Sequence, residues 1–213
     1  MIRRPPRSTP SNSSAASDVY KRQPIRAVEE WSRSPDLLVV NGAPAICYFY
    51  TEDGGGIHYA RALDADGTAW GDPVSLDSEP YAGRWWSSMA VVNGNPAICY
   101  KEDSNEDLKY VRALDANGNA WGTPLILDSE GKVGTSCSLA VIRGCPAIAY
   151  MGYDDPDYHL KYVQATDADG SEWREPVTVD TDYGFWHCSM KEVSGCPAIS
   201  YITDSELRFA IYY

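Results

Sequence analysis

Short apolar runs alternate with polar turns along this chain, and the pattern returns after about fifty residues. Within residues 88–129 the apolar runs cover 89–92, 96–100, 108–113 and 121–127. Runs of this length, bounded by Gly, Asn, Asp and Pro, predict β-strands, and no segment has a helical period of useful length. Asn-Gly between the first two runs is the strongest local signal for a β-hairpin. The unit therefore predicts four antiparallel strands.

Two landmarks recur along the chain, the first in four copies of the unit and the second in three. Gly-x-Pro-Ala-Ile begins at Gly42, Gly94, Gly144 and Gly195. Asp-Ala-Asp/Asn-Gly-x-x-Trp spans 64–70, 115–121 and 167–173. A four-stranded unit of about fifty residues resembles the blade of a β-propeller, as in kelch and WD-repeat proteins. The sequence thus predicts an all-β propeller, or a truncated arc of one, with about four blades visible.

The repeats also divide the chain. Predicted blades span 36–77, 88–128 and 138–180, with a fourth strand of another blade at 24–30 and a partial blade at 189–213. Before them, 1–9 and 13–23 resemble the translation of a sequencing-library adapter, so residues 1–23 are interpreted as a non-native, disordered tail. An adapter junction inside a strand favours a gene truncated upstream, which leaves a signal peptide unobservable. A closed ring of four blades is the alternative.

Charge and hydropathy exclude two classes of partner. The formal net charge is -12, and residues 1–23 carry 5 of the 18 basic and 1 of the 30 acidic residues. The remainder has 13 basic against 29 acidic residues, a net charge of -16, which argues against a nucleic-acid partner. No apolar run approaches the roughly 20 residues of a membrane span, so we expect no membrane insertion. We expect a monomer or a part of a larger chain.

Sequence variation among the copies separates two sets of connections. The Asn-Gly-type and Asp-Ala-Asp-Gly turns are short and nearly identical, and in a propeller they share one face. The connections on the other face differ in length and content: 51–56, 102–107, 152–159, 77–86, 128–137 and 180–188. Function unique to this protein is expected there, because the scaffold does not dictate those residues.

The variable connections are rich in aromatic residues and carboxylates. The candidate ligand-binding residues are Trp85, Trp86, Asp103, Tyr153, Asp154, Tyr183 and Trp186. Flat aromatic surfaces beside carboxylates suit sugar rings, and they equally suit a protein partner, where Trp and Tyr are strong anchors. The alternative for the three tryptophans is packing between blades.

The Asp64–Trp70 segment resembles the Asp-box of sialidase-type propellers, which occupies the turn between the third and fourth strands. The match is partial, because the leading Ser/Thr is absent and the Asp spacing differs. The Asp-box is structural, so the resemblance implies a turn and no sialidase activity. Asp-x-Asp-Gly also suggests Ca²⁺, but calcium loops recruit more oxygen ligands. A solvated turn with a packing Trp is favoured, and no cofactor is predicted.

Histidines and cysteines do not form a predicted metal site. A zinc site from His159, His187, Cys137 and Cys188 lacks a close-spaced ligand pair. His58 shares its repeat position with Lys109, Lys161 and Arg208, which predicts an exposed basic position.

Paired repeat positions instead favour disulfides between adjacent blades. The predicted bonds are Cys137–Cys188 and Cys145–Cys196, because neighbouring inner strands converge near the axis. Such bonds imply an oxidising, extracellular or cell-surface location.

These observations lead to three functional hypotheses. The leading one is a non-catalytic, secreted or surface binding module that recognises glycan or protein through the variable face. The first alternative is a glycan-active hydrolase or lyase, with Asp103 and Asp154 as the first candidates for paired carboxylates. The second is a purely structural repeat domain of a larger surface protein. Near-identity of the copies favours binding or architecture over catalysis.

Overall fold

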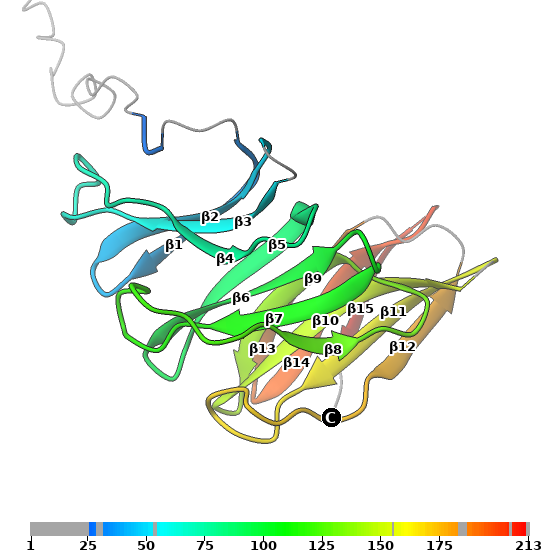
Figure 1. The fold of residues 1–213 in the computed structure, drawn as a ribbon. Helices are drawn as coiled ribbons and strands as arrows, with labels where there is room; N and C mark the ends of the chain where they lie inside the picture. Colours follow the sequence, from blue (N-terminus) through cyan, green and yellow to red (C-terminus); the bar gives the residue numbers. More distant parts are fainter. Residues whose placement is uncertain are drawn as a thin grey trace, which may run out of the picture.

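Four antiparallel β-sheets make up the computed structural model of this protein (Figure 1). It describes residues 26–28, 32–52, 55–154, 156–182, 187–204 and 206–211. All fifteen elements of this described part are strands, and it contains no helix able to cross a membrane. The predicted all-β class is confirmed.

The strands of each sheet follow one another in chain order. The first sheet contains β1 (Ser32–Val40), β2 (Ala43–Tyr50), β3 (Gly56–Arg61) and β4 (Val74–Asp77). The second contains β5 (Ala82–Val92), β6 (Asn95–Glu102), β7 (Asp107–Arg112) and β8 (Leu125–Asp128). The third contains β9 (Lys132–Ile142), β10 (Cys145–Asp154), β11 (Asp157–Gln164) and β12 (Val177–Asp182). The fourth contains β13 (His187–Val193), β14 (Cys196–Ile202) and β15 (Leu207–Ile211). Each sheet corresponds to one predicted repeat and is called a blade below.

Two boundaries add detail to the predicted segments. The first strands of the second and third blades begin at Ala82 and Lys132, six residues before the predicted blade starts. In the predicted strand at 24–30, the described residues 26–28 are not in a strand, and the rest lies outside the described residues. The tail at 1–23 also lies outside them.

The hairpin turns between first and second strands explain one landmark. Asn93 has a φ of 44° and Gly94 a φ of 82°. Positive φ at both central residues is the type I′ arrangement, whose twist matches that of the flanking strands. The same positive pair recurs at 41–42, 143–144 and 194–195. Glycine is therefore repeated because each turn needs a left-handed residue.

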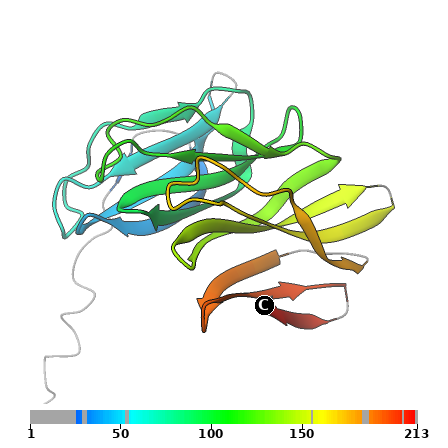
Figure 2. The same cartoon turned by 90° about the horizontal axis from the view of Figure 1, so that it is seen from below.

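Neighbouring blades contact one another through their first strands, β1 to β5, β5 to β9 and β9 to β13. Figure 2 shows the blades following one another from blue to red along the chain. A side-chain oxygen at one repeated position bonds the next blade: the Asp36 carboxylate accepts the Met89 N–H at 2.7 Å. The Ser88 and Ser138 hydroxyls accept the Leu139 and Met190 N–H groups in the same way.

The hydrophobic core lies between successive blades. Three buried clusters each combine side chains of two neighbouring sheets. The repeated tyrosines Tyr48, Tyr100 and Tyr150 are at most 1% exposed. Since each blade buries one side against its neighbour, stability comes from blade-to-blade packing rather than from a single sheet.

Candidate functional site

The turn face comprises the connections at the Gly-x-Pro-Ala-Ile and Asp-x-x-Gly-x-x-Trp landmarks. In one of these turns the Asp115 carboxylate accepts the N–H groups of Asn117 (2.9 Å) and Ala120 (2.9 Å). Partial burial raises the pKa of Asp115, but these backbone donors outweigh it and leave that pKa below its usual value. The Trp121 indole N–H donates to the Gly118 carbonyl at 2.8 Å. Equivalent bonds form at Asp64 and Asp167.

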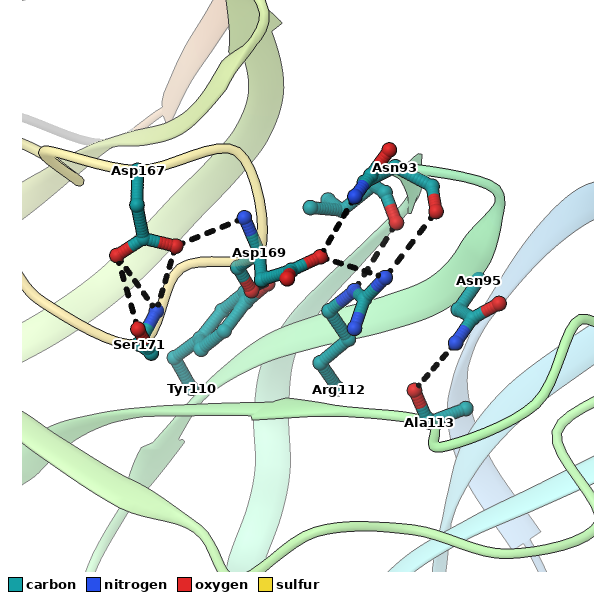
Figure 3. A network of polar contacts seen from close by, with 9 residues as sticks. Asn93, Asn95, Tyr110, Arg112, Ala113, Asp167, Asp169 and Ser171 are labelled. Carbon is teal, nitrogen blue, oxygen red and sulfur yellow. Dashed lines mark hydrogen bonds and ion pairs between the residues drawn. The ribbon is translucent and has the colours of Figure 1, made fainter.

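These turns also join one blade to the next. Figure 3 shows the contact between the second and third blades, where the Asn93 amide and the Arg112 guanidinium reach Asp169 at 2.8 and 3.0 Å. The Tyr110 hydroxyl donates to the Asp169 carbonyl, and its ring meets Trp173 edge-on with centroids 4.9 Å apart. Among the described residues no group of three or more His, Cys, Asp or Glu could hold a metal ion. These contacts of the turn face hold neighbouring blades together.

A second repeated contact lies at the end of each blade's last strand. The buried Asp128 carboxylate on β8 accepts the Tyr150 hydroxyl at 2.6 Å and pairs with Lys161 at 2.5 Å, both in the third blade. The preceding interface repeats it with Asp77, Tyr100 and Lys109, and the following one with Asp180, Tyr201 and Arg208. Burial and the Asp180 charge raise the pKa of Tyr201 to about 12. We call this contact the aspartate lock.

The aspartate lock corrects one prediction. The repeat position of His58 and Lys109 was expected to be an exposed basic position, but Lys109 is only 8% exposed. The reason is that the preceding blade brings its Asp77 against this position, at 3.0 Å from the lysine nitrogen.

The loop face comprises the β4–β5, β6–β7, β8–β9 and β10–β11 connections and the strand ends beside them. Trp85 and Trp86 on β5 have ring centroids 6.4 Å apart but different surroundings. The Trp85 side chain is 47% exposed, whereas Trp86 is partly buried and packs against the core between the second and third blades. Packing between blades therefore accounts for Trp86, and Trp85 remains on the surface.

The β6–β7 connection holds Asp103 in an ordered loop. Its carboxylate lies 3.0 Å from the Lys101 nitrogen. Beneath it the buried Glu102 carboxylate accepts the N–H groups of Ser104 (2.6 Å) and Asn105 (2.9 Å). Burial raises the pKa of Glu102, but these donors hold it below its usual value.

Tyr153 and Asp154 meet on the third blade. Tyr153 and Tyr158 are direct partners in the β10–β11 register, with ring centroids 4.6 Å apart. They line a hollow of about 350 Å³ with Lys132, Thr135, Met151 and Gly152. We call this hollow the tyrosine depression. Beside it, one Asp154 oxygen lies 3.5 Å from the His159 Nε2 atom.

Lys132 connects the tyrosine depression to the second blade. Its nitrogen lies 3.5 Å from the Glu106 carboxylate, and Glu106 is also 3.7 Å from Lys101. The loops of Asp103 and Asp154 are thus neighbours across one blade interface. Sequence reasoning places Tyr158 among the aromatic residues of the variable connections without choosing it as a binding residue, and it missed Lys132 and Glu106. The hairpin register would have indicated Tyr158, but Lys132 and Glu106 meet only because two blades pack together.

The remaining candidates are less informative. Tyr183 and Trp186 lie outside the described residues. All six cysteines are free thiols in the structure, and burial raises the pKa of Cys47 to about 12. The predicted Cys137–Cys188 and Cys145–Cys196 bonds stay predictions.

Comparison with known proteins gives structural relatives alone. No protein-family model and no curated protein matches the chain. A Hadza microbial sialidase is similar with a TM-score of 0.66 at 15% identity, over 84% of this chain and 43% of the sialidase. A Trypanosoma rangeli sialidase in complex with 2,3-difluorosialic acid has a TM-score of 0.60 at 16% identity, over 85% and 35%. An endo-arabinase from Bacteroides thetaiotaomicron has a TM-score of 0.52 at 16% identity, over 88% and 78%.

These likenesses correct the leading functional hypothesis. The non-catalytic binding module is contradicted, because the similar solved structures are glycan-cleaving enzymes, which favours the hydrolase alternative. The physical reason is that near-identity of the blades reports the shared scaffold and carries no information about chemistry in the loops. The chain spans less than half of the length of either sialidase. At these identities the likeness shows the fold, and the chain is an all-β propeller seen as four successive blades.

Proposed function

We propose that this protein is a glycan-active hydrolase whose substrate lies on the loop face at the tyrosine depression. One observation carries the proposal: a paired tyrosine platform meets carboxylates from two blades, in a fold shared with glycan-cleaving enzymes. The proposal rests on this coincidence of shape and chemistry, since no motif marks the site.

The tyrosine depression has the properties of a sugar subsite. The Tyr153 and Tyr158 rings, inclined at 45°, offer an apolar surface to the face of a sugar ring. Lys132 and Thr135 supply hydrogen-bonding groups for the hydroxyls at its rim. A hollow of about 350 Å³ lies within the range of small-molecule sites.

Two carboxyl groups beside the depression are candidates for the chemistry. Glycoside hydrolysis uses one carboxyl group to protonate the leaving oxygen and a second to attack the sugar or activate water, at roughly 5–10 Å separation. We assign these roles to Asp154, which contacts His159, and to Glu106, which contacts Lys132. Asp103 is a weaker candidate because its side chain is less exposed, 17% against 33% for Glu106.

Hydrolysis assays test this assignment. Wild type is expected to release sugar from at least one of arabinan, a sialylated oligosaccharide and polygalacturonate, measured as reducing ends or free sialic acid. Asp154→Asn and Glu106→Gln should each lower the rate by about 10²–10⁴-fold. Asp157→Asn is the matched control, because Asp157 is exposed and faces Asp154 in the β10–β11 register. Wild type inactive on all three substrates, or full activity in Asp154→Asn, would contradict the proposal.

Location and turn type complete the proposal. An extracellular or cell-surface location suits a polymeric glycan substrate and the predicted inter-blade disulfides. Thiol titration of the denatured, unreduced protein should find two reactive thiols, and six would contradict the bonds.

The turn bonds of Asp64, with the Trp70 indole donating to the Gly67 carbonyl, support a role for this hairpin like that of the Asp-box.

A further inference from the structure

An arginine lies stacked on aromatic rings at the opening of the second blade. The central carbon of the Arg84 guanidinium is 4.9 Å from the centroid of the Trp85 ring and 5.1 Å from that of Tyr81. Tyr81 and Trp85 are 45% and 47% exposed, so the group lies at the surface of the loop face. We call these three residues the Arg84 stack.

The backbone beneath the Arg84 stack is fixed. The Arg84 N–H donates to the Tyr81 carbonyl at 3.2 Å, and the Arg84 carbonyl accepts the Ser34 hydroxyl of the first blade at 2.9 Å. Tyr81 has a φ of 65°, which turns the chain sharply into β5. The backbone that carries the rings and the guanidinium is therefore ordered before any ligand arrives, which lowers the entropy cost of binding.

Cation–π contact with the two rings leaves the N–H groups at the edge of the guanidinium available. The edge carries five N–H donors in a planar fork that matches a carboxylate. Among the described residues, none of the hydrogen bonds or ion pairs involves the Arg84 guanidinium. The guanidinium groups of Arg112 and Arg208 are instead paired with the Asp169 and Asp180 carboxylates. What distinguishes Arg84 among the described arginines is that its guanidinium lies against two exposed aromatic rings. In a chain of net charge -12, this combination of a cation and aromatic rings suits an external anion.

The Arg84 stack lies on the second blade, next to the third blade, which carries the tyrosine depression. Trp85 stands three residues before Ser88 on β5, and Thr135 stands three residues before Ser138 on β9. Ser88 and Ser138 are equivalent, since each accepts an N–H from the next blade. β5 and β9 are in contact. The wall of the depression and the Arg84 stack are thus equivalent positions of adjacent blades.

We propose that the Arg84 stack binds the carboxylate of an acidic sugar, a hexuronic acid unit of a polysaccharide. The guanidinium edge pairs with the carboxylate in a bidentate manner, and the exposed Trp85 ring packs against the sugar face. This inference deepens the proposed function, because it names an acidic glycan as the substrate of the same loop face.

Binding measurements by calorimetry test the inference, with oligogalacturonate and its methyl ester as probes. The acid should bind at least about ten-fold more tightly than the ester, which corresponds to one charge-assisted bond. Arg84→Gln should remove this preference, and Arg84→Lys should reduce it because a lysine cannot form the planar fork. Trp85→Ala should weaken acid and ester alike. Arg174→Gln, the same charge change at an exposed residue near the turn face, is the control and should leave binding unchanged.

The outcomes separate this inference from the proposed function. Equal binding of acid and ester, or an Arg84→Gln variant that binds like wild type, would overturn it. Stronger binding of a polyglutamate peptide than of oligogalacturonate would show that the occupant is a protein instead. Binding that depends on Arg84 in a protein without hydrolytic activity would refute the hydrolase and leave the inference standing.

Discussion

The turn face and the loop face are opposite ends of the same strands, yet they differ in what their contacts do. On the turn face, the Tyr59 hydroxyl donates to the Asn117 carbonyl, and one blade later the Tyr110 hydroxyl donates to the Asp169 carbonyl. On the loop face, the Arg84 stack and the tyrosine depression each occur once among the described residues. Repeated contacts hold successive blades together, and single contacts are where recognition and chemistry are expected.

The aspartate lock marks the border between the two regions. It recurs at each described blade interface but lies beneath the variable loops. The scaffold therefore extends to the foot of the loop face, so that changes above the lock should alter function and changes within it should alter stability. The predictions below follow this division, from the largest expected effect to the smallest.

Breaking an aspartate lock should lower the free energy of unfolding more than any of the other substitutions below. Asp128→Ala leaves the Lys161 charge and the Tyr150 hydroxyl without their acceptor, in a place where the Asp128 side chain is 2% exposed. We expect the free energy of unfolding to fall by about 3–5 kcal/mol, as for other buried pairs that lose one partner. Urea denaturation measures it. The exposed Asp72→Ala is the control, and a loss below about 1 kcal/mol for Asp128→Ala would show that water replaces the lock.

Trp121→Ala should have the next largest effect. The indole meets the Tyr59 ring edge-on at 5.0 Å and donates to Gly118. Because Trp121 is only partly buried, we expect a loss of about 2–3 kcal/mol, below the range for a fully buried tryptophan. Trp85→Ala on the loop face is the matched control, with an expected change within about 0.5 kcal/mol. Similar losses in both variants would contradict the division between the faces.

Asp115→Asn should lower the free energy of unfolding by about 1 kcal/mol at pH 7, an effect comparable to the loss of a helix-capping side chain. Its effect should depend on pH, because the pKa of Asp115 is lowered in the folded protein. The ionised Asp115 carboxylate therefore stabilises the folded protein at pH values above 3.8, its pKa in the unfolded chain. This stabilisation is lost as the pH falls through the lower pKa that Asp115 has in the folded protein. Thermal unfolding at a series of pH values should show wild type and variant converging in acid. A constant difference would mean that the loss is steric.

Asp107→Asn should have a small effect of opposite sign. Burial and then the Glu102 charge raise the pKa of Asp107, so the folded protein disfavours the ionised form. Wild type therefore loses stability as the pH rises from the pKa of Asp107 in the unfolded chain through its higher pKa in the folded protein. The variant has no carboxyl group at this position and does not lose this stability. We expect Asp107→Asn to be slightly more stable than wild type at pH 7 and equal to it in acid. A destabilised variant at pH 7 would indicate that the carboxylate is needed as an acceptor.

Local chemistry made the scaffold predictable. The period, the type I′ pairs such as Asn93-Gly94, and the strands between them depend on residues adjacent in sequence. The function of the Asp115 turn was also accessible, because its acceptor and donors lie within five residues. The site was not. Trp85 and Trp86 are neighbours in the sequence, but only the packing of adjacent blades determines that one is exposed and the other partly buried.

The sequence by itself determined that the chain repeats a four-stranded unit and turns in the same way each time, because hairpin turns and strand patterns are short-range properties. Only the tertiary structure decided which loop residues meet. Lys132 reaches Glu106, and Asp128 reaches Lys161, across blade interfaces. Such contacts depend on how two sheets pack and twist against each other, and no local pattern of residues encodes that distance.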